Sequence, residues 1–523
     1  MIADMMSPDR RAFLKGVAAL AATASIMRPR ATWAQARPRF ADHPFKLGVA
    51  SGDPLPDGMV LWTRLAPDPL RGGGLPAESV IVQWEVAEDE GMRHVARKGS
   101  TVASADLGHS VHVEVDGLKP GRVYWYRFHA GAESSPVGRT RTAPAPGAPP
   151  ERLRFAFASC QHWESGFYAG YRHMLDDDLD LICHLGDYIY EGSFRSPPVR
   201  RHDQPEAKDL ETYRLRHALY KTDPDLRAAH AACPWVVTWD DHEVCNDYAN
   251  DHSEYRGDPR TFLQRRAGAY QAYYEHMPLR RASLPRGPAL HLYRALGWGG
   301  LADFFVLDNR QYRSVQPCGE GRRGGGQLVE ATCMENVAAA QTMLGTTQEA
   351  WLFEGLRRAG SRWTILAQQQ LMAALRQRDR NGAEAYWTDA WDGYAGARQR
   401  LLAHLRDARV PNPVVIGGDI HSYWVTDLQV EPREGAPVVA SEFVGTSMTS
   451  PSIPYETFAR FLPENPHVRF FESRQRGYVR CTVTADRWLT ELRVLDNVAD
   501  RRSAIGTLAS FIVESGRPGP QRV

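Results

Sequence analysis

The feature that most constrains the fold of this chain is a series of compact apolar runs that recur after residue 150. Each run has the length of a buried strand, and longer segments of helical period, such as residues 165–177 and 346–360, lie between them. Continuous apolar strands that alternate with helices are typical of α/β proteins with covered sheets. The sequence therefore predicts a layered α/β core. The runs are RFAFASC, LDLICHLGD, PWVVTWDD, LADFFVLD, RWTILAQ and PVVIGGDIH.

The segment before this core has a different pattern. Apolar side chains alternate along residues 79–86 and again along residues 112–131, around a Lys-Pro-Gly turn, which indicates half-buried antiparallel strands. We expect an immunoglobulin-like or fibronectin-like β-sandwich over residues 37–143, followed by a stiff Pro-rich linker over 144–150. The α/β domain would then span 151–500, and 501–523 would form a C-terminal helix or tail.

The composition indicates a globular chain with no strong charge preference. The 523 residues include 43% hydrophobic and 24% charged residues, with a formal net charge of +1. These values argue against disorder and against the basic surface that a nucleic-acid partner needs. We expect a monomer that binds no nucleic acid.

The N-terminus has the features of an export signal. Arg10 and Arg11 precede a short apolar run over residues 17–27, which is shorter than the ~20 residues of a membrane-spanning helix. An Ala-Gln-Ala cleavage site follows at 34–36. The sequence therefore predicts a twin-arginine signal peptide over 1–36, the twin-arginine translocase as a partner, and a periplasmic or secreted location.

The seven cysteines are too few for disulfides to be the main source of stability. Cys318 and Cys333 lie in a Gly-rich polar segment and are the best candidates for a disulfide that closes a loop. The other thiols have apolar neighbours, where a cysteine is ordinarily a small buried hydrophobic residue.

Several apolar runs end in groups that can bind metals: Cys160, Asp187, Asp240-Asp241-His242 and the pair Asp419 and His421. Ligands of open α/β sheets gather at the carboxyl ends of strands. A single Gly-Asp pair is more often a turn or a helix cap than a ligand. Four such ends with a thiol, carboxylates and imidazoles instead indicate a transition metal beside a harder ion. The patterns of zinc proteases, serine hydrolases and P-loop enzymes are absent.

Seven blocks of the sequence, in their order, carry a family resemblance. They are FASC, HLGDYIYEG, residues 217–251, LDNRQYRS, LGTTQEAWL, WTILAQQQLM and GGDIHSYWVTDL. The chain resembles the PhoD-type alkaline phosphatases and phosphodiesterases of the calcineurin-like metallophosphoesterase superfamily, from the export signal to the last strands. The resemblance implies a two-sheet sandwich flanked by helices, and a metal centre with iron (Fe3+) and calcium (Ca2+).

The resemblance also implies a ligand for each position of the centre. Asp187 matches a carboxylate shared by the metals, and Tyr190 matches a phenolate bound to ferric iron. Cys160 would be a thiolate ligand of the iron, and His421 its imidazole ligand. The chain departs from the wider superfamily at Asp419, where related phosphatases usually have a histidine, and an oxygen donor there favours calcium.

The second metal would be bound by further oxygens from the block after PWVVTW. Asp241 replaces the asparagine of the superfamily motif, and Asn246 is preferred as an additional ligand over Asp240 and Asp247. His242 would lie closest to the substrate and donate a hydrogen bond or a proton. The implied reaction is hydrolysis of phosphomonoesters or phosphodiesters by a metal-bound hydroxide.

Three alternatives remain open at this point. One is a phospholipase D-like phosphodiesterase of the same family, because the sequence does not identify the substrate. The second is a periplasmic ferric-binding or redox protein, which would hold one exchangeable iron and no harder ion. The third is a non-catalytic binding protein in which the motifs are only turns.

Overall fold

The computed structural model describes residues 38–194, 197–255, 257–319, 324–337 and 339–523, with only the backbone given for 335–337. The predicted signal peptide over 1–36 lies outside these residues. Within the described ranges, no helix combines the length and the apolar character that crossing a membrane requires.

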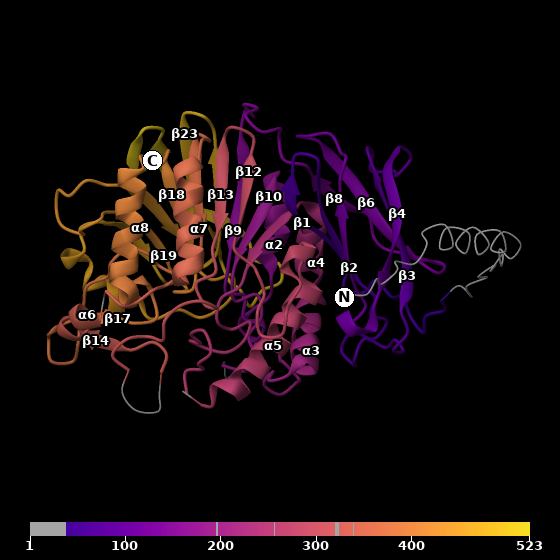
Figure 1. The fold of residues 1–523 in the computed structure, drawn as a ribbon, viewed down its shortest axis with the longest axis horizontal. Helices are drawn as coiled ribbons and strands as arrows, with labels where there is room; N and C mark the ends of the chain where they lie inside the picture. Colours follow the sequence, from indigo (N-terminus) through magenta and orange to yellow (C-terminus); the bar gives the residue numbers. More distant parts are fainter. Residues whose placement is uncertain (1–37, 195–196, 256, 320–323, 338) are drawn as a thin grey trace, which may run out of the picture. The chain divides into compact units, whose positions relative to one another are not determined.

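The larger of the two main sheets has ten strands (Figure 1). Its centre is parallel, because β10 pairs with β9 on one side and with β11 on the other in the same direction. The strands on either flank are mainly antiparallel. In spatial order the strands are β25 (Arg517–Arg522), β24 (Ile505–Glu514), β23 (Arg487–Leu495), β22 (Arg476–Val483), β9 (Leu153–Ala158), β10 (Leu181–Leu185), β11 (Trp235–Thr238), β1 (Val49–Leu55), β2 (Gly58–Arg64) and β5 (Ser110–Val115).

The second main sheet has seven strands, and its centre is also parallel, from β13 through β15 and β18 to β20. Each predicted apolar run of the α/β core is a strand of one of these two sheets. The strands of the second sheet are β12 (Arg294–Trp298), β13 (Ala302–Val306), β15 (Trp363–Ala367), β18 (Pro413–Gly417), β20 (Ala440–Val444), β19 (Tyr423–Leu428) and β21 (Val468–Glu472).

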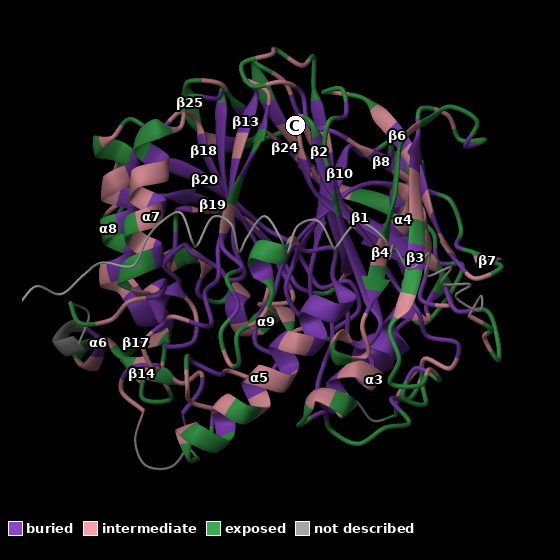
Figure 2. Ribbon diagram, turned by 45° about the vertical axis from the view of Figure 1, so that its right-hand side comes forward, coloured by how far each residue is buried: buried purple, intermediate pink, exposed green. Residues whose placement is uncertain are grey.

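The two main sheets share one hydrophobic core. Phe155 and Phe157 of β9 and Phe304 of β13 belong to the same buried cluster. The alternate residues of β9, Ala156 and Ala158, belong to a different cluster on the opposite face of the sheet. This period of two explains the continuous apolar runs, because both faces of each strand are buried. Figure 2 shows these strands as the buried interior.

Helices cover the outer faces of both sheets, which confirms the predicted α/β class. Residues of α2, α3, α4 and α5 pack in the cluster outside the larger sheet, and residues of α7 and α8 pack outside the second sheet. Two further helices, α6 and α9, are short. The bounds are α2 (Ala169–Met174), α3 (Leu210–Lys221), α4 (Pro224–Ala232), α5 (Pro259–His276), α6 (Ala331–Val337), α7 (Gly345–Arg358), α8 (Ala395–Asp407) and α9 (Tyr455–Ala459).

Two smaller sheets complete the fold. One has the order β4-β3-β6-β7, with β8 also paired to β6, and the other has the order β14-β17-β16. Their strands are β3 (Val80–Ala87), β4 (Val95–Ala103), β6 (Val123–Ala130), β7 (Glu133–Ser134), β8 (Gly138–Arg141), β14 (Leu328–Glu330), β16 (Gln377–Arg378) and β17 (Glu384–Trp387).

The N-terminal strands differ from the separate sandwich expected over 37–143. Two layers do pack together there, since Leu61 and Val113 share a core cluster with Val82 and Phe128. However, β1, β2 and β5 continue the ten-stranded sheet through the pairing of β1 with β11. Residues Phe40–Val523 accordingly form one compact unit.

The prediction of a helix in the C-terminal segment is wrong. β24 pairs with β23 along its length, and β25 follows as the edge strand. The buried residues of β24, Ala509, Phe511 and Val513, have a period of two and join the core between the sheets. Burial of this alternating face outweighs the helical pattern that the apolar residues also allow.

The disulfide prediction is confirmed. Cys318 and Cys333 are joined, with their Cα atoms 6.2 Å apart. The other five cysteines are unpaired and buried, as the apolar surroundings predicted.

Candidate metal centre

The candidate site lies where strands of both main sheets end. Cys160 follows β9, Asp187 follows β10, and Asp241 follows β11 in the larger sheet. Asp419 and His421 follow β18 of the second sheet. Because β9, β10 and β11 are parallel neighbours, their carboxyl ends meet at one edge, and the loop after β18 faces them there.

The backbone at these strand ends is unusual. Cys160, Asp187, Asp419 and His421 all have positive φ angles, at 57°, 54°, 64° and 59°. Such a conformation costs a non-glycine residue on the order of 1–3 kcal/mol and persists where neighbouring interactions impose it. Strained positions of this kind cluster at functional sites, and here they coincide with predicted ligands.

Gly186 allows the ends of β10 and β11 to approach closely. Its φ is +108°, and a Cβ atom there would lie 2.4 Å from the Cβ atom of Asp240. Any side chain at this position would therefore force apart the two loops that carry Asp187 and Asp241.

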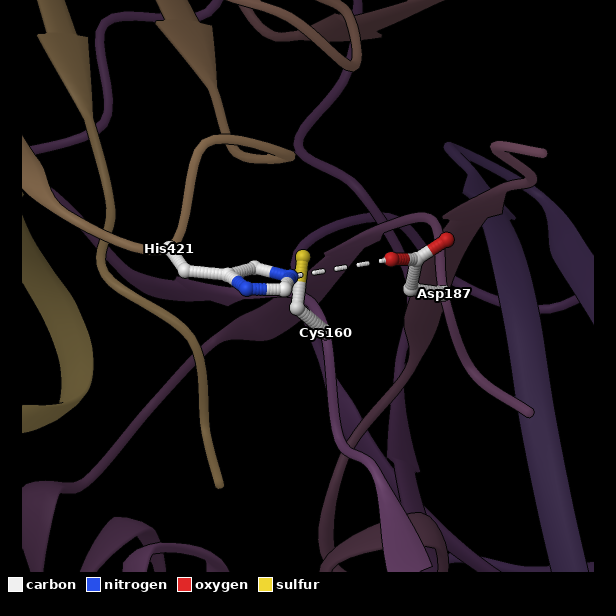
Figure 3. A group of neighbouring side chains, drawn as sticks. All are labelled: Cys160, Asp187 and His421. Atoms are coloured by element: carbon white, nitrogen blue, oxygen red, sulfur yellow. Dashed lines mark ion pairs between the residues drawn. The ribbon is translucent and has the colours of Figure 1, made fainter. Parts of the chain in front are cut away.

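One group of donors combines sulfur, oxygen and nitrogen. Ligand atoms of Cys160, Asp187 and His421 lie within 4.8 Å of one another (Figure 3). The Tyr190 hydroxyl donates to Oδ2 of Asp187 at 2.8 Å and lies 3.2 Å from Nε2 of His421. The carbonyl of Pro451, 2.7 Å from Nδ1 of His421, fixes the ring so that Nε2 faces the group. A thiol, a phenol, an imidazole and a carboxylate form a donor set that suits a transition metal.

The second group consists of oxygens only. Carboxylate atoms of Asp240, Asp241 and Asp419 lie within 4.8 Å of one another. Asp187 belongs to both neighbourhoods, because its carboxylate also lies within 4.8 Å of Asp241 and His242. An all-oxygen set is the preference of hard ions such as calcium.

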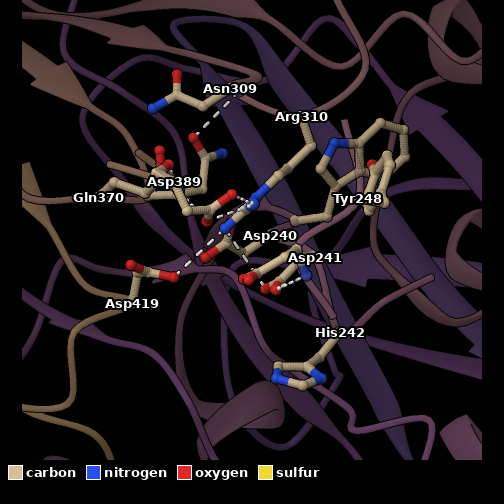
Figure 4. Close-up of polar contacts among 12 residues, drawn as sticks. Asp240, Asp241, His242, Tyr248, Asn309, Arg310, Gln370, Asp389 and Asp419 are labelled. Atoms are coloured by element: carbon tan, nitrogen blue, oxygen red, sulfur yellow. Dashed lines mark hydrogen bonds and ion pairs between the residues drawn. The ribbon is translucent and has the colours of Figure 1, made fainter. Parts of the chain in front are cut away.

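Arg310 is a buried cation among these carboxylates (Figure 4). Its guanidinium pairs with Asp240, with Asp389 at 2.8 Å and with Asp419 at 3.4 Å. It lies 3.6 Å from Asp241, the fourth carboxylate around it. Because Arg310 is fully buried, we assign it to charge balance rather than to contact with a substrate.

The cluster still has more negative than positive groups. Burial and neighbouring carboxylates raise the pKa of Asp187 and of Asp419 well above the usual range. Oδ2 of Asp240 and Oδ1 of Asp241 are buried and have no hydrogen-bond donor among the described residues. Buried acceptors without partners are costly, and bound cations would supply their missing partners. The residues present therefore fit a metal centre.

His242 is held beside both groups. Its Nδ1 lies 2.7 Å from Oε2 of Glu191, and its ring packs at a tilt against Tyr190 with centroids 4.2 Å apart. The other carboxylate oxygen of Glu191 accepts the backbone N–H of Asn246 at 2.9 Å. Burial opposes protonation of His242, but the charges of Glu191, Asp241 and Asp187 raise its pKa well above the usual value.

A cavity of about 710 Å³ opens over the centre. Six of the predicted residues line it, while Cys160 and Tyr190 do not line it but lie against Asp187 and His421. The structure thus brings all eight predicted residues together. The six that line the cavity are Asp187, Asp241, His242, Asn246, Asp419 and His421.

The sequence prediction missed Arg310 and Asp389 and left Glu191 without a role. Arg310 lies in the quoted block LDNRQYRS just after β13, so its position at a strand end was an available signal. Asp389 lies in a loop after β17 with no such signal. Cys245 is buried near the centre, and His184 and His252 belong to none of the metal-competent groups of the described residues.

Comparison with known proteins agrees with this geometry. Residues 155–492 match the model of the PhoD-like phosphatase family, and residues 31–144 match the model of its N-terminal domain. The chain belongs to the PhoD-like phosphatase family. Membership makes it a hydrolase of phosphoester bonds.

Two similar proteins of the PhoD-like family support this assignment. Alkaline phosphatase D of Bacillus subtilis (strain 168) is 46% identical over 528 residues, covering 98% of this chain and 89% of that protein. A solved structure described as the structure of PhoD is 48% identical, with a TM-score of 0.88 over 93% of each chain.

Proposed function

We propose that this chain is an exported, metal-dependent phosphoesterase with iron and calcium in the centre at the strand ends. The observation that carries the proposal is the meeting of two donor sets of different chemistry at one cavity. Cys160, Asp187, Tyr190 and His421 would hold Fe3+. Asp241, Asn246 and Asp419 would hold Ca2+. When bound, such ions neutralise phosphoryl oxygens and lower the pKa of a coordinated water.

His242 is proposed as the catalytic residue, because its position suits proton transfer. Glu191 occupies Nδ1, which leaves Nε2 for the cavity that His242 lines. When water adds to phosphorus and the bond to the leaving oxygen breaks, Nε2 donates a proton to that oxygen. Glu191 stabilises the protonated ring and fixes its plane. General acid assistance of this kind typically contributes ~10²–10⁴-fold in rate.

The cavity also favours one kind of ester. The lining also includes apolar side chains: Leu371, Ile420 and Phe458, and the exposed Trp387 and Ile453. No lysine or arginine is among the lining residues that the structure describes. This chemistry favours a diester with an apolar organic group, such as a phospholipid, over a polyanionic chain of phosphates. It supports the phospholipase D-like alternative.

Metal content and colour test the assignment of the centre. We expect about one iron and at least one calcium per chain, with a visible ferric-phenolate band that Tyr190→Phe abolishes. Iron without calcium, and no hydrolysis of any phosphoester, would instead support a ferric-binding protein. An unchanged spectrum and rate in both Tyr190→Phe and Cys160→Ala would contradict the iron assignment.

Paired substrates test the role of the apolar wall. We expect Phe458→Ala to raise KM for a dialkyl or diacylglycerol phosphodiester several-fold and to leave KM for a glycerol phosphate ester unchanged. Equal effects on both substrates would contradict the preference for an apolar group.

Export is tested by fractionation. Replacement of both Arg10 and Arg11 by lysine should retain the protein in the cytoplasm, because the signal over 1–36 depends on the arginine pair. Unchanged export of this variant would contradict the twin-arginine route.

A further inference from the structure

A further metal-competent group lies beside the centre, next to Tyr190. It consists of His162, Glu164 and His202, whose ligand atoms lie within 4.8 Å of one another. All three side chains are buried, at 1%, 4% and 1% exposure. None belongs to the two donor sets described above. The ring centroid of His162 is 4.7 Å from that of Tyr190, so the group is adjacent to the centre but distinct from it.

One ligand atom of each residue has no hydrogen-bond partner among the described residues: Nε2 of His162, Oε2 of Glu164 and Nδ1 of His202. The other polar atoms of these side chains are engaged. Nδ1 of His162 lies 2.7 Å from the Ser165 hydroxyl, and Nε2 of His202 lies 3.1 Å from the Tyr220 hydroxyl. Oε1 of Glu164 accepts the backbone N–H of His202 at 3.2 Å.

This arrangement is the one that metal-binding imidazoles adopt. A ligating histidine usually hydrogen-bonds through its second nitrogen to a neighbouring group, which fixes the ring and the tautomer. Ser165 and Tyr220 occupy that position for His162 and His202.

The donor types and spacing select the class of ion. Nδ1 of His202 lies 3.9 Å from Oε2 of Glu164, a gap that an ion bound at about 2.0–2.2 Å to each atom would fill after a small contraction. Two imidazoles with one carboxylate suit zinc and similar divalent transition metals, and offer too few oxygens for calcium.

We propose that His162, Glu164 and His202 bind a divalent transition metal of the zinc type, which joins the segment over residues 197–209 to the turn over Trp163–Ser165. Other contacts already join these parts. The carbonyl of Glu164 accepts the backbone N–H of Val199 at 2.8 Å, and the indole N–H of Trp163 donates to the carbonyl of Arg201 at 2.9 Å. The ion adds a strong link between segments that are about forty residues apart.

The link has a structural consequence for the centre. Phe194 packs against both the group and the centre, since its ring centroid is 5.9 Å from that of His162 and 5.3 Å from that of His242. By fixing His162, the ion would hold this aromatic contact in place without contacting the substrate. The alternative to a metal ion is a proton shared between Nδ1 of His202 and Oε2 of Glu164.

Metal counting distinguishes these occupants. The full-length protein is loaded with zinc, freed of weakly bound ions by gel filtration, and analysed by elemental mass spectrometry. We expect the wild type to contain one more zinc per chain than Glu164→Gln or His202→Gln, while iron content stays the same in all three. The matched control is His112→Gln, a buried histidine of β5 outside every metal-competent group of the described residues, and it should match the wild type. Equal zinc contents in wild type and variants would overturn the proposal.

A measurement on the wild type alone covers the case in which a variant does not fold. Anomalous diffraction at the zinc edge from zinc-loaded crystals should show a peak between His162, Glu164 and His202. The absence of that peak would overturn the proposal, whether or not iron and calcium are found in the centre.

Discussion

Glu191 shows how one side chain can set the geometry of a neighbour. Its two carboxylate oxygens are divided between Nδ1 of His242 and the backbone N–H of Asn246. It therefore fixes the proposed general acid and the start of the loop that carries a proposed calcium ligand. Glu191 itself does not line the cavity. It acts through His242 as a positioning residue.

Replacement of Glu191 by glutamine should lower kcat and leave KM nearly unchanged. The amide keeps the volume but removes the charge that stabilises the protonated His242 ring, and losses of such supporting partners cost about 10- to 100-fold. Steady-state kinetics on an aryl phosphodiester measure the effect. The exposed Glu211→Gln on α3 is the control and should behave as wild type. A kcat within twofold of wild type in Glu191→Gln would contradict the positioning role.

Lys221 is a buried lysine without a carboxylate partner in the part of the chain that the structure describes. Its Nζ lies 3.4 Å from Nε2 of His230 and 4.4 Å from the ring centroid of Trp62. Burial lowers the pKa of Lys221 to about 7. The positive charge of Lys221 also helps to lower the pKa of His184 and His230. The surroundings thus disfavour the protonated forms of Lys221, His184 and His230.

Replacement of Lys221 by methionine should stabilise the protein at pH 7 but not at pH 10.5. The folded pKa of about 7 is below the usual lysine pKa of 10.5, so the unfolded chain binds more protons between these values and stability rises with pH across that window. The gain at pH 7 should be on the order of 1–3 kcal/mol. Thermal unfolding at both pH values measures it, with the exposed Lys208→Met as control. A gain that is equal at both pH values would show that protonation of Lys221 is not its cause.

Backbone hydrogen bonds link the segment just before β14 to the candidate centre. The backbone N–H of Gly326, just before β14, donates to Oδ2 of Asp247 at 2.7 Å. The backbone N–H of Asp247 in turn donates to Asp241 at 2.6 Å. The disulfide between Cys318 and Cys333 closes the segment that contains Gly326, so a covalent link supports one side of the cavity.

Removal of this disulfide should weaken the protection of β14. The bond closes a loop with a sequence separation of 15, for which chain entropy gives about 3 kcal/mol. In the double variant Cys318→Ser/Cys333→Ser, amide hydrogen exchange of β14 should accelerate, while exchange of β9 and β10 stays the same. Addition of a reductant should not further accelerate hydrogen exchange of β14 in the double variant. Unchanged exchange in β14 would contradict the role of the bond.

The metal centre joins the two main sheets. Asp187 and Asp241 come from the larger sheet and Asp419 from the second, and their carboxylates meet at the same place. Arg310 balances part of this charge. Ions that bind only the folded chain stabilise it by mass action, so the centre should contribute to the stability of both layers.

Chelation of the metals should lower the temperature of unfolding. Without bound cations the buried carboxylates repel one another, and the folded state loses the free energy of binding. Differential scanning calorimetry with and without chelator measures the drop. It should be smaller in Asp419→Asn, which removes one charge, and unchanged in the exposed control Asp106→Asn. Equal unfolding temperatures with and without chelator would contradict this role of the centre.

The class of the fold and the residues proposed as ligands could be predicted from the sequence. Buried strands produce continuous apolar runs, and the proposed ligands Cys160, Asp187, Asp241 and Asp419 follow those runs directly. Both signals are local, because the apolar run and the polar residue that follows it lie within a few positions of each other in the sequence. The period of residues 503–516 was ambiguous, and there the choice of helix was wrong.

Which segments share a sheet and which charges meet depends on how the sheets pack, and the sequence alone did not predict it. The pairing of β1 with β11 and of β24 with β23 sets the extent of the larger sheet. Arg310 and Asp389 are almost eighty positions apart, and the group of His162, Glu164 and His202 spans about forty. Such pairs leave no periodic signal, because their free energy comes from burial and charge in a place that exists only after the sheets have packed.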